Sequence, residues 1–97
     1  MIKHTVLFKL KGSEQERLNI ARQFTEALNK LPEIIPQLIS IETGININPA
    51  EKWDIVLTAV AESLEDIAIY SAHPAHQDAV AIIAPYKEER ACVDYFA

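Results

Sequence analysis

The chain has 97 residues, 49% of them hydrophobic and 24% charged, and its formal net charge is −5. A chain of this length is expected to form one domain over residues 1–97, with ample apolar material for a small core. The acidic balance and the lack of a basic cluster argue against nucleic acid as a partner.

Cys92 is the only cysteine, so no internal disulfide can form, which fits a reducing compartment. Residues 1–11 interleave lysines with apolar residues, unlike the continuous apolar core of a signal peptide. No apolar run reaches the length of a bilayer-spanning helix, so no membrane partner is expected. These features predict a cytoplasmic protein.

Residues 1–10 alternate apolar and polar side chains, a pattern typical of a strand with one buried face. His4 falls among the apolar positions, which predicts that it points inward. Ser13 followed by Glu16 is the sequence of a capping box, and it opens a helix that we expect to run to about Lys30.

Two further strands are predicted in the middle of the chain. Prolines end the first helical region, and residues 37–47 then read as a strand in which Gly44 allows a bend or bulge. Residues 53–62 form the next strand, and both of its faces are apolar. One face carries Trp53, Ile55, Leu57, Ala59 and Ala61, and the other carries Val56, Thr58 and Val60. A strand of this kind is covered on both faces.

The last third of the chain predicts a broken helical segment and a final strand. Ser63 precedes an acidic residue by three positions, as in a capping box, and opens a short helix. Pro74 interrupts the helical pattern, and a second helix follows that Pro85 closes. We interpret residues 87–90 as a solvated turn and residues 91–96 as the last strand.

The predicted order of elements is β-α-β-β-α-β. The expected class is therefore α+β, a ferredoxin-like sandwich in which a four-stranded antiparallel sheet carries its helices on one face. Helices leave the second face of such a sheet bare, whereas residues 53–62 need cover on both faces. A second copy provides this cover, which predicts a homodimer by sheet-to-sheet packing, that is, a dimeric α/β-barrel.

The stretch Tyr70–His76 concentrates candidate functional residues at the break between the two helices. Pro74 pushes His73 out of the helical conformation and suits the first position of the next helix, so His73 is expected near the N-cap. His76 then lies in the first turn, where the helix dipole favours the neutral imidazole that can accept a proton. The structural alternative is that Tyr70 and His76 only satisfy each other or the backbone at this corner.

The chain resembles the stress-responsive α/β-barrel (Dabb) domain family over essentially its whole length. The resemblance rests on the opening MIKHTVLFKL, on Ser63-Leu64-Glu65-Asp66 followed by Tyr70, on His73-Pro74-Ala75-His76, and on the closing Val93-Asp94-Tyr95. It implies a ferredoxin-like protomer and a homodimer whose two sheets form a barrel. Most members of the family have no assigned reaction.

One branch of this family, the polyketide cyclases similar to olivetolic acid cyclase, closes a linear polyketide by an aldol condensation without a cofactor. The resemblance implies that His76 is the catalytic base and Tyr70 its partner. It also implies that His4, on the first strand, points into the pocket, and that His73 belongs to the same motif. Where these cyclases have a further pocket histidine, this chain has Ile55, so the polar lining is poorer.

Two functions are compatible with these residues. The first is an uncharacterised stress-responsive homodimer with an apolar small-molecule pocket between sheet and helices, in which His4, His73 and Ile55 contact the ligand. The alternative is a cofactor-independent enzyme of the polyketide cyclase type that acts on a small apolar carbonyl compound, with His76 as general base and Tyr70 as its partner. A cofactor-free oxygenase is a related hypothesis by analogy of fold.

The His73-x-x-His76 spacing resembles a metal site, but two histidines are too few, so we expect neither a metal nor a cofactor.

Overall fold

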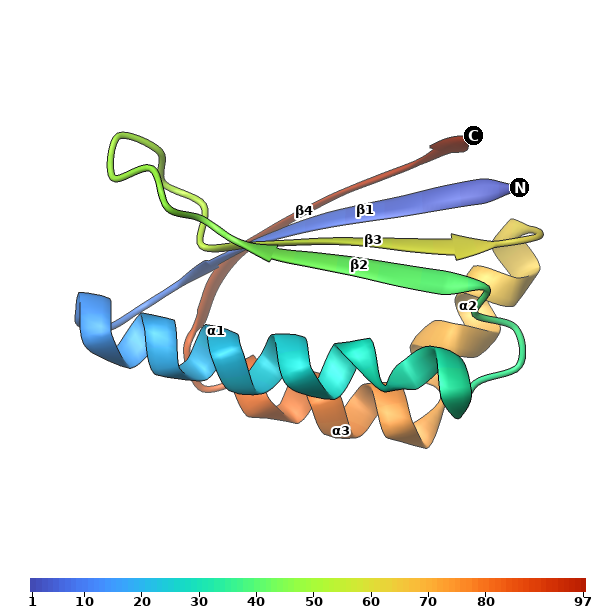
Figure 1. Ribbon diagram of the computed structural model, residues 1–97, viewed down its shortest axis with the longest axis horizontal. Coiled ribbons are helices and arrows are strands. Elements are labelled where there is room, and N and C mark those ends of the chain that lie inside the picture. The colour runs from blue at the N-terminus through green and yellow to red at the C-terminus, as the bar shows by residue number, and fades with distance from the viewer.

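The chain follows the predicted order of elements, with the second helical segment divided into two helices (Figure 1). The computed structural model describes all residues 1–97. Its elements are β1 (Ile2–Leu10), α1 (Glu14–Asn29), a short 3-10 helix η1 (Leu31–Glu33), β2 (Ser40–Ile45), β3 (Ile55–Ala61), α2 (Leu64–Ala72), α3 (Pro74–Ile83) and β4 (Lys87–Phe96). None of these helices combines the length and the apolar character needed to span a membrane.

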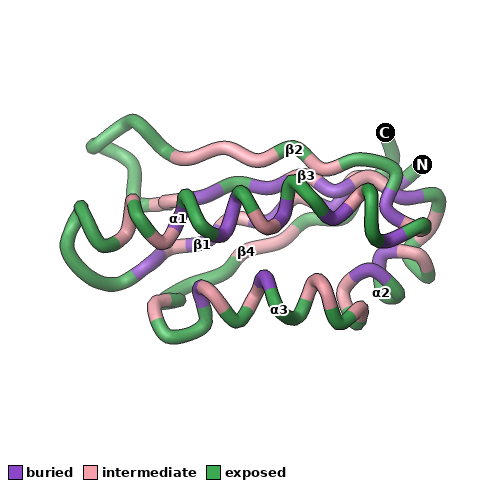
Figure 2. The backbone as a smooth tube through the Cα atoms, turned by 60° about the horizontal axis from the view of Figure 1, so that its bottom comes forward, coloured by how far each residue is buried: buried purple, intermediate pink, exposed green.

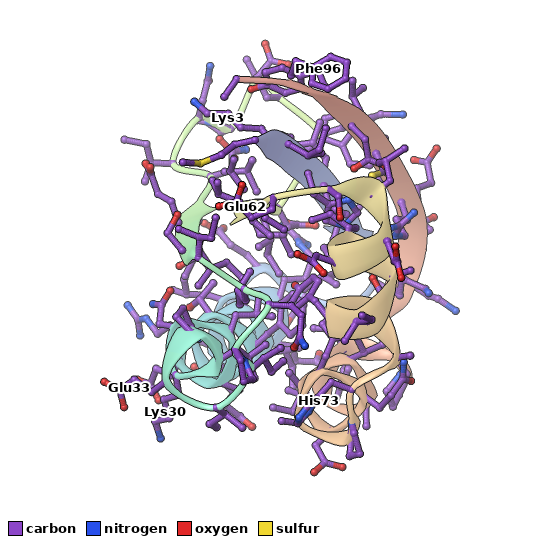
Figure 3. All side chains as sticks on the ribbon, turned by 90° about the vertical axis from the view of Figure 1, so that its right-hand side faces the viewer. Lys3, Lys30, Glu33, Glu62, His73 and Phe96 are labelled. Atoms are coloured by element: carbon purple, nitrogen blue, oxygen red, sulfur yellow. The ribbon has the colours of Figure 1, made fainter.

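The four strands form one antiparallel sheet in the order β2-β3-β1-β4. The helices lie on one side of this sheet, and the other side carries no helix (Figure 1). The view along the molecule separates the two sides, with Lys3 on the open side and His73 far from it on the helical side (Figure 3). The predicted ferredoxin-like α+β class is confirmed.

Alternation along the central strands separates the two faces of the sheet. The apolar positions of β1 and β3 that face the helices are buried: Ile2, Val6, Phe8, Leu10, Ile55, Leu57, Ala59 and Ala61. Phe24 and Leu28 of α1 pack in the same core, and the rings of Phe8 and Phe24 meet edge to face with 5.4 Å between centroids. Figure 2 shows this buried layer where α1 crosses the strands.

Both predicted helix starts are capped by a serine, but only the first has a complete capping box. The N–H of Glu16 donates to Ser13 Oγ at 3.1 Å, and the N–H of Ser13 donates to Glu16 Oε1 at 3.4 Å. Gly12, just before this cap, has a φ of 107°, which glycine adopts without steric cost. At α2 the N–H of Asp66 donates to Ser63 Oγ at 3.2 Å, but the reciprocal bond does not form, because aspartate is one methylene shorter than glutamate.

The last strand is longer than predicted. The interpretation of residues 87–90 as a solvated turn is wrong, because they belong to β4 and pair with the end of β1. Phe8 is the register partner of Arg90, and Lys9 Nζ lies 2.6 Å from Glu88 Oε2 across the two strands. Charged side chains are common on edge strands, so this part of β4 lacks the apolar alternation that would mark it in the sequence.

The two middle strands are shorter than the predicted ranges 37–47 and 53–62. The connector still turns around Pro36, so β2 begins only after that turn. Trp53 precedes β3 and is only partly buried, and the ammonium group of Lys52 lies 4.9 Å from the centroid of its ring. The apolar face of β3 therefore starts at Ile55, not at the tryptophan.

Gly44 has a packing role and does not form the predicted bend or bulge. β2 and β3 pair in unbroken register through this position, with Val56 as the partner of Gly44. A Cβ added here would lie 3.1 Å from Val56 Cγ1, so any side chain would crowd the pair.

Replacing Leu28 by alanine is expected to lower the free energy of unfolding by about 2–5 kcal/mol, because a fully buried leucine leaves a cavity in the core. Leu64→Ala is the matched control, since this helical leucine is 59% exposed and its loss should change stability by less than about 0.5 kcal/mol. Urea denaturation of both variants measures the difference. Equal losses in the two variants would contradict the packing of α1 on the sheet.

Candidate functional site

The break between α2 and α3 positions the candidate residues. His73 lies between the helices with φ −62° and ψ 137°, the extended conformation that a following proline favours. Its Nδ1 accepts a hydrogen bond from the N–H of Ala75 at 3.0 Å, so His73 is the N-cap of α3, as predicted. Pro74 follows at the first helical position, where no N–H needs a partner.

His76 lies in the first turn of α3 and is half-buried. Its Nδ1 is 2.8 Å from the carbonyl oxygen of Ser71 at the end of α2. A carbonyl only accepts, so Nδ1 carries the proton and Nε2 of the neutral ring has the free lone pair. Burial lowers the pKa of His76 below its ordinary value of 6.5; the Ser71 bond opposes this, and the nearby charges of His4 and Arg90 lower it further. The ring is therefore neutral at pH 7.

Tyr70 lies beside His4 and His76 and is completely buried. The centroid of its ring is 4.5 Å from that of His76 and 6.2 Å from that of His4. Its hydroxyl group is closed off from solvent and has no hydrogen-bond partner. Burial raises the pKa of this phenol, and only the charge of Arg90 acts in the opposite direction. An unpaired buried hydroxyl costs about 1–3 kcal/mol, so this group is an unsatisfied donor and acceptor next to two imidazoles.

A hydrogen bond to Asp94 fixes the ring of His4. The two residues are register partners on the neighbouring strands β1 and β4, and His4 Nδ1 lies 2.5 Å from Asp94 Oδ1. An ionised carboxylate only accepts, so Nδ1 of His4 carries the proton of this bond. The predicted inward orientation of His4 is confirmed, since only 7% of the residue is exposed.

A cavity of about 200 Å³ brings three of the candidate residues together between the sheet and the helices. His4, Tyr70 and His76 all line it. The remaining polar lining comes from Ser71, Gln77, Lys87 and Arg90, and the apolar lining from Val6, Phe8, Phe24, Leu57 and Val80. The arrangement is an apolar chamber with two imidazoles and a phenol, which can hold a small organic molecule and exchange protons with it.

Two residues predicted to contact a ligand do not line this cavity. His73 points its Nδ1 at the backbone of α3, and Ile55 is 1% exposed within the core. Conversely, Arg90 lines the cavity and was missed in the sequence, because it lies in the run that was interpreted as a turn. Extending the alternation of the last strand backwards from Asp94 by two pairs of residues would have placed it on the inner face.

His4, Cys92 and Asp94 are the side chains whose ligand atoms come close enough for a metal ion, within 4.8 Å of one another. However, His4 Nδ1 and Asp94 Oδ1 are 2.5 Å apart. Two such ligands of one tetrahedral zinc lie about 3.3–3.6 Å apart, given metal–ligand distances of roughly 2.0–2.2 Å. Burial raises the pKa of Cys92, and the charge of Asp94 raises it further, which keeps the thiol protonated at neutral pH. The geometry fits a hydrogen-bonded pair beside a thiol.

A larger hollow of about 1030 Å³ is lined by the start of α1 and the loop from β2 to β3. These two segments lie at the end of the molecule opposite to α2 (Figure 1). The hollow is open to solvent and is lined by charged side chains of both signs. Two of them, Arg17 and Asp54, already form an ion pair with 3.2 Å between Nε and Oδ1. This surface has no imidazole or phenol and favours no single ligand charge.

Several solved structures resemble the chain. A dimeric protein of unknown function with a ferredoxin-like fold from Bacteroides fragilis is 44% identical, with a TM-score of 0.94 over 97% of this chain and 93% of that one. A dimeric ferredoxin-like protein of unknown function from Thermobifida fusca is 30% identical, with a TM-score of 0.80 over 97% and 88% of the two chains. A hydroxynitrile lyase from Passiflora edulis is 17% identical with a TM-score of 0.74 over 97% and 90%, a likeness that shows the fold alone. No curated protein matches the sequence.

The family model of the Stress responsive A/B Barrel Domain (Dabb) matches residues 2–97. This match covers every strand and helix described above, including the cavity with His4, Tyr70 and His76. The chain therefore belongs to the stress responsive A/B barrel domain (Dabb) family.

Proposed function

We propose that the protein is a homodimer, joined through the open faces of its two sheets, that binds a small organic molecule in the cavity between sheet and helices. The observation that carries this proposal is the convergence of His4, Tyr70 and His76 on one chamber with apolar walls. If these residues had only a structural role, their buried polar groups would normally be hydrogen-bonded within the protein, and no cavity would be needed beside them.

The size of the cavity limits the ligand. Pockets for drug-sized molecules measure about 300–1,000 Å³, whereas this one has about 200 Å³. We therefore expect a compact ligand with one ring or a short chain, and not an extended polyketide. The apolar walls select for an apolar body, and the imidazoles and the phenol select for a polar group such as a carbonyl.

The second copy is proposed to cover the open face of the sheet. Strand alternation directs several apolar side chains to this face: Leu7, Val56, Val60, Ala91, Val93 and Tyr95. Val93 is 63% exposed and Tyr95 45%, and an exposed apolar surface of this kind is typical of an interface. The similar proteins from Bacteroides fragilis and Thermobifida fusca are described as dimeric, which supports the same assembly for this chain.

His76 favours catalysis as a second candidate function. Its ring is neutral, its Nδ1 is fixed by Ser71, and Nε2 is left to accept a proton. Such a base can remove a proton next to a carbonyl group, and a nearby phenol can stabilise the enolate that forms. This is the first step of an aldol-type reaction, and it needs no cofactor.

Replacing Val93 by aspartate places a charge in the proposed interface and is expected to weaken the dimer at least about tenfold, because an unpaired charge is costly to bury. Sedimentation equilibrium measures the dissociation constant. Leu64→Asp is the control, since it adds the same charge on α2, on the helical side of the sheet, and should leave the dimer intact. A monomeric wild-type protein, or a Val93→Asp variant that dimerises normally, would rule out this packing.

Replacing Tyr70 by phenylalanine removes the unpaired hydroxyl and is expected to raise the free energy of unfolding by about 1 kcal/mol. Urea denaturation measures this change, provided that the m-value, the dependence of the free energy of unfolding on urea concentration, is the same in both proteins. Tyr86→Phe is the control, since Tyr86 is only partly buried and its hydroxyl can be hydrated, so little change is expected. A loss of more than about 1 kcal/mol in Tyr70→Phe would support the purely structural reading of the corner.

Exchange of the methyl protons of acetophenone for deuterium in D₂O tests the catalytic candidate without knowledge of the natural substrate. His76→Gln should slow the exchange by about two to four powers of ten, the usual contribution of a positioned base. The active form is the neutral ring, and its pKa lies below 6.5, so the rate should rise with pH through a midpoint below pH 6.5 and then stay constant.

His73→Asn serves as the control for this experiment, because asparagine preserves the N-cap of α3 and removes only an imidazole outside the cavity. It should keep the wild-type rate. If the wild-type protein does not accelerate exchange, or if His76→Gln retains the rate, the catalytic candidate fails while the binding proposal stands.

A further inference from the structure

We propose that the ligand of the cavity is an anion: a small molecule with an apolar body and a carboxylate-like group that pairs with Arg90 at the inner face of β4. This inference rests on the proposed binding function and adds the charge of the ligand to it.

The lining of the cavity differs in charge from the rest of the molecule. The whole chain has a formal net charge of −5, yet no aspartate or glutamate lines the cavity. The charged residues that do line it are Lys87 and Arg90, both cations. The cavity lining thus carries two cations and no carboxylate. Its local electrostatic potential therefore attracts anions, although the protein as a whole is acidic.

Arg90 has no carboxylate partner in the protein. The ion pairs of the structure join His4 to Asp94, Lys9 to Glu88, Arg17 to Asp54, and Lys52 to Glu89. The acidic neighbours of Arg90 along β4 are thus each occupied by another residue. Its guanidinium contacts the thiol of Cys92 but has no anionic partner, and its planar fork matches a carboxylate better than any other side chain.

Arg90 also lies close to the polar centre of the chamber. It is the register partner of Phe8, which forms part of the apolar wall, and its charge lowers the pKa values of both Tyr70 and His76. A carboxylate paired with Arg90 would thus lie at the edge of the apolar wall. This places the charged group of the ligand on β4 and its apolar body against β1 and α1.

The preference is expected to be moderate, because Arg90 is exposed to solvent and its field is screened. Benzoate and benzamide form a matched pair of probes with the same ring and nearly the same shape, one charged and one neutral. Titration of the 97-residue protein with each probe at constant ionic strength, followed by ¹H–¹⁵N correlation NMR, gives both dissociation constants. Benzoate should bind the wild-type protein about tenfold more tightly than benzamide, with shifts centred on the cavity.

Three variants locate the source of this preference. Arg90→Gln should weaken benzoate about tenfold and leave benzamide unchanged, and Arg90→Lys should retain part of the preference. Arg22→Gln is the matched control, since it removes an exposed arginine from α1, outside the cavity, and should change neither constant. Equal binding of the two probes, or equal weakening of both in Arg90→Gln, overturns the anion preference while the cavity remains a binding site. Failure of both probes to bind overturns the cavity as well.

Discussion

The site depends on the break that Pro74 imposes between α2 and α3. In a continuous helix the carbonyl of Ser71 would accept the N–H of Ala75, four residues later. The break frees both groups. Nδ1 of His73 accepts from the N–H of Ala75, and the carbonyl of Ser71 accepts from Nδ1 of His76 and from Nε2 of Gln77. The interruption of the backbone thus decides which nitrogen of His76 carries the proton. It leaves Nε2 as the acceptor of a ring that lines the cavity.

At position 70, stability of the fold and binding of a ligand favour different residues. A buried phenol without a partner costs stability, and a phenylalanine would fill the same space without that cost. Locally unfavourable choices of this kind are expected at functional sites, where the group is kept for what it does to a ligand. The neighbouring imidazoles strengthen this view, because two of the three histidines in the chain lie around the same ring.

Most of the fold could be predicted from local patterns, whereas the site required tertiary information. The alternation of β1 and the serine cap of α1 are encoded within a few residues, and both were confirmed. The bond between His4 and Asp94 joins residues 90 positions apart, and alternation alone does not tell which residue of β4 faces His4. The same limit hid Arg90, since a charged edge strand reads as a turn until its register is known. Ile55, expected in the pocket, lies in the core instead, and it is Leu57, two residues further along β3, that lines the cavity.

The register of β4 links the proposed assembly to the cavity. β4 is an edge strand that pairs only with β1, and its residues alternate between the two faces of the sheet. A slip by one residue would move Arg90 and Asp94 to the open face and bring Val93 inward. On the face toward the helices, the bond between Asp94 and His4 opposes such a slip. On the open face, the proposed sheet-to-sheet contact through Val93 would oppose it as well. Dimerisation would therefore hold in place the strand that supplies the cationic wall of the cavity.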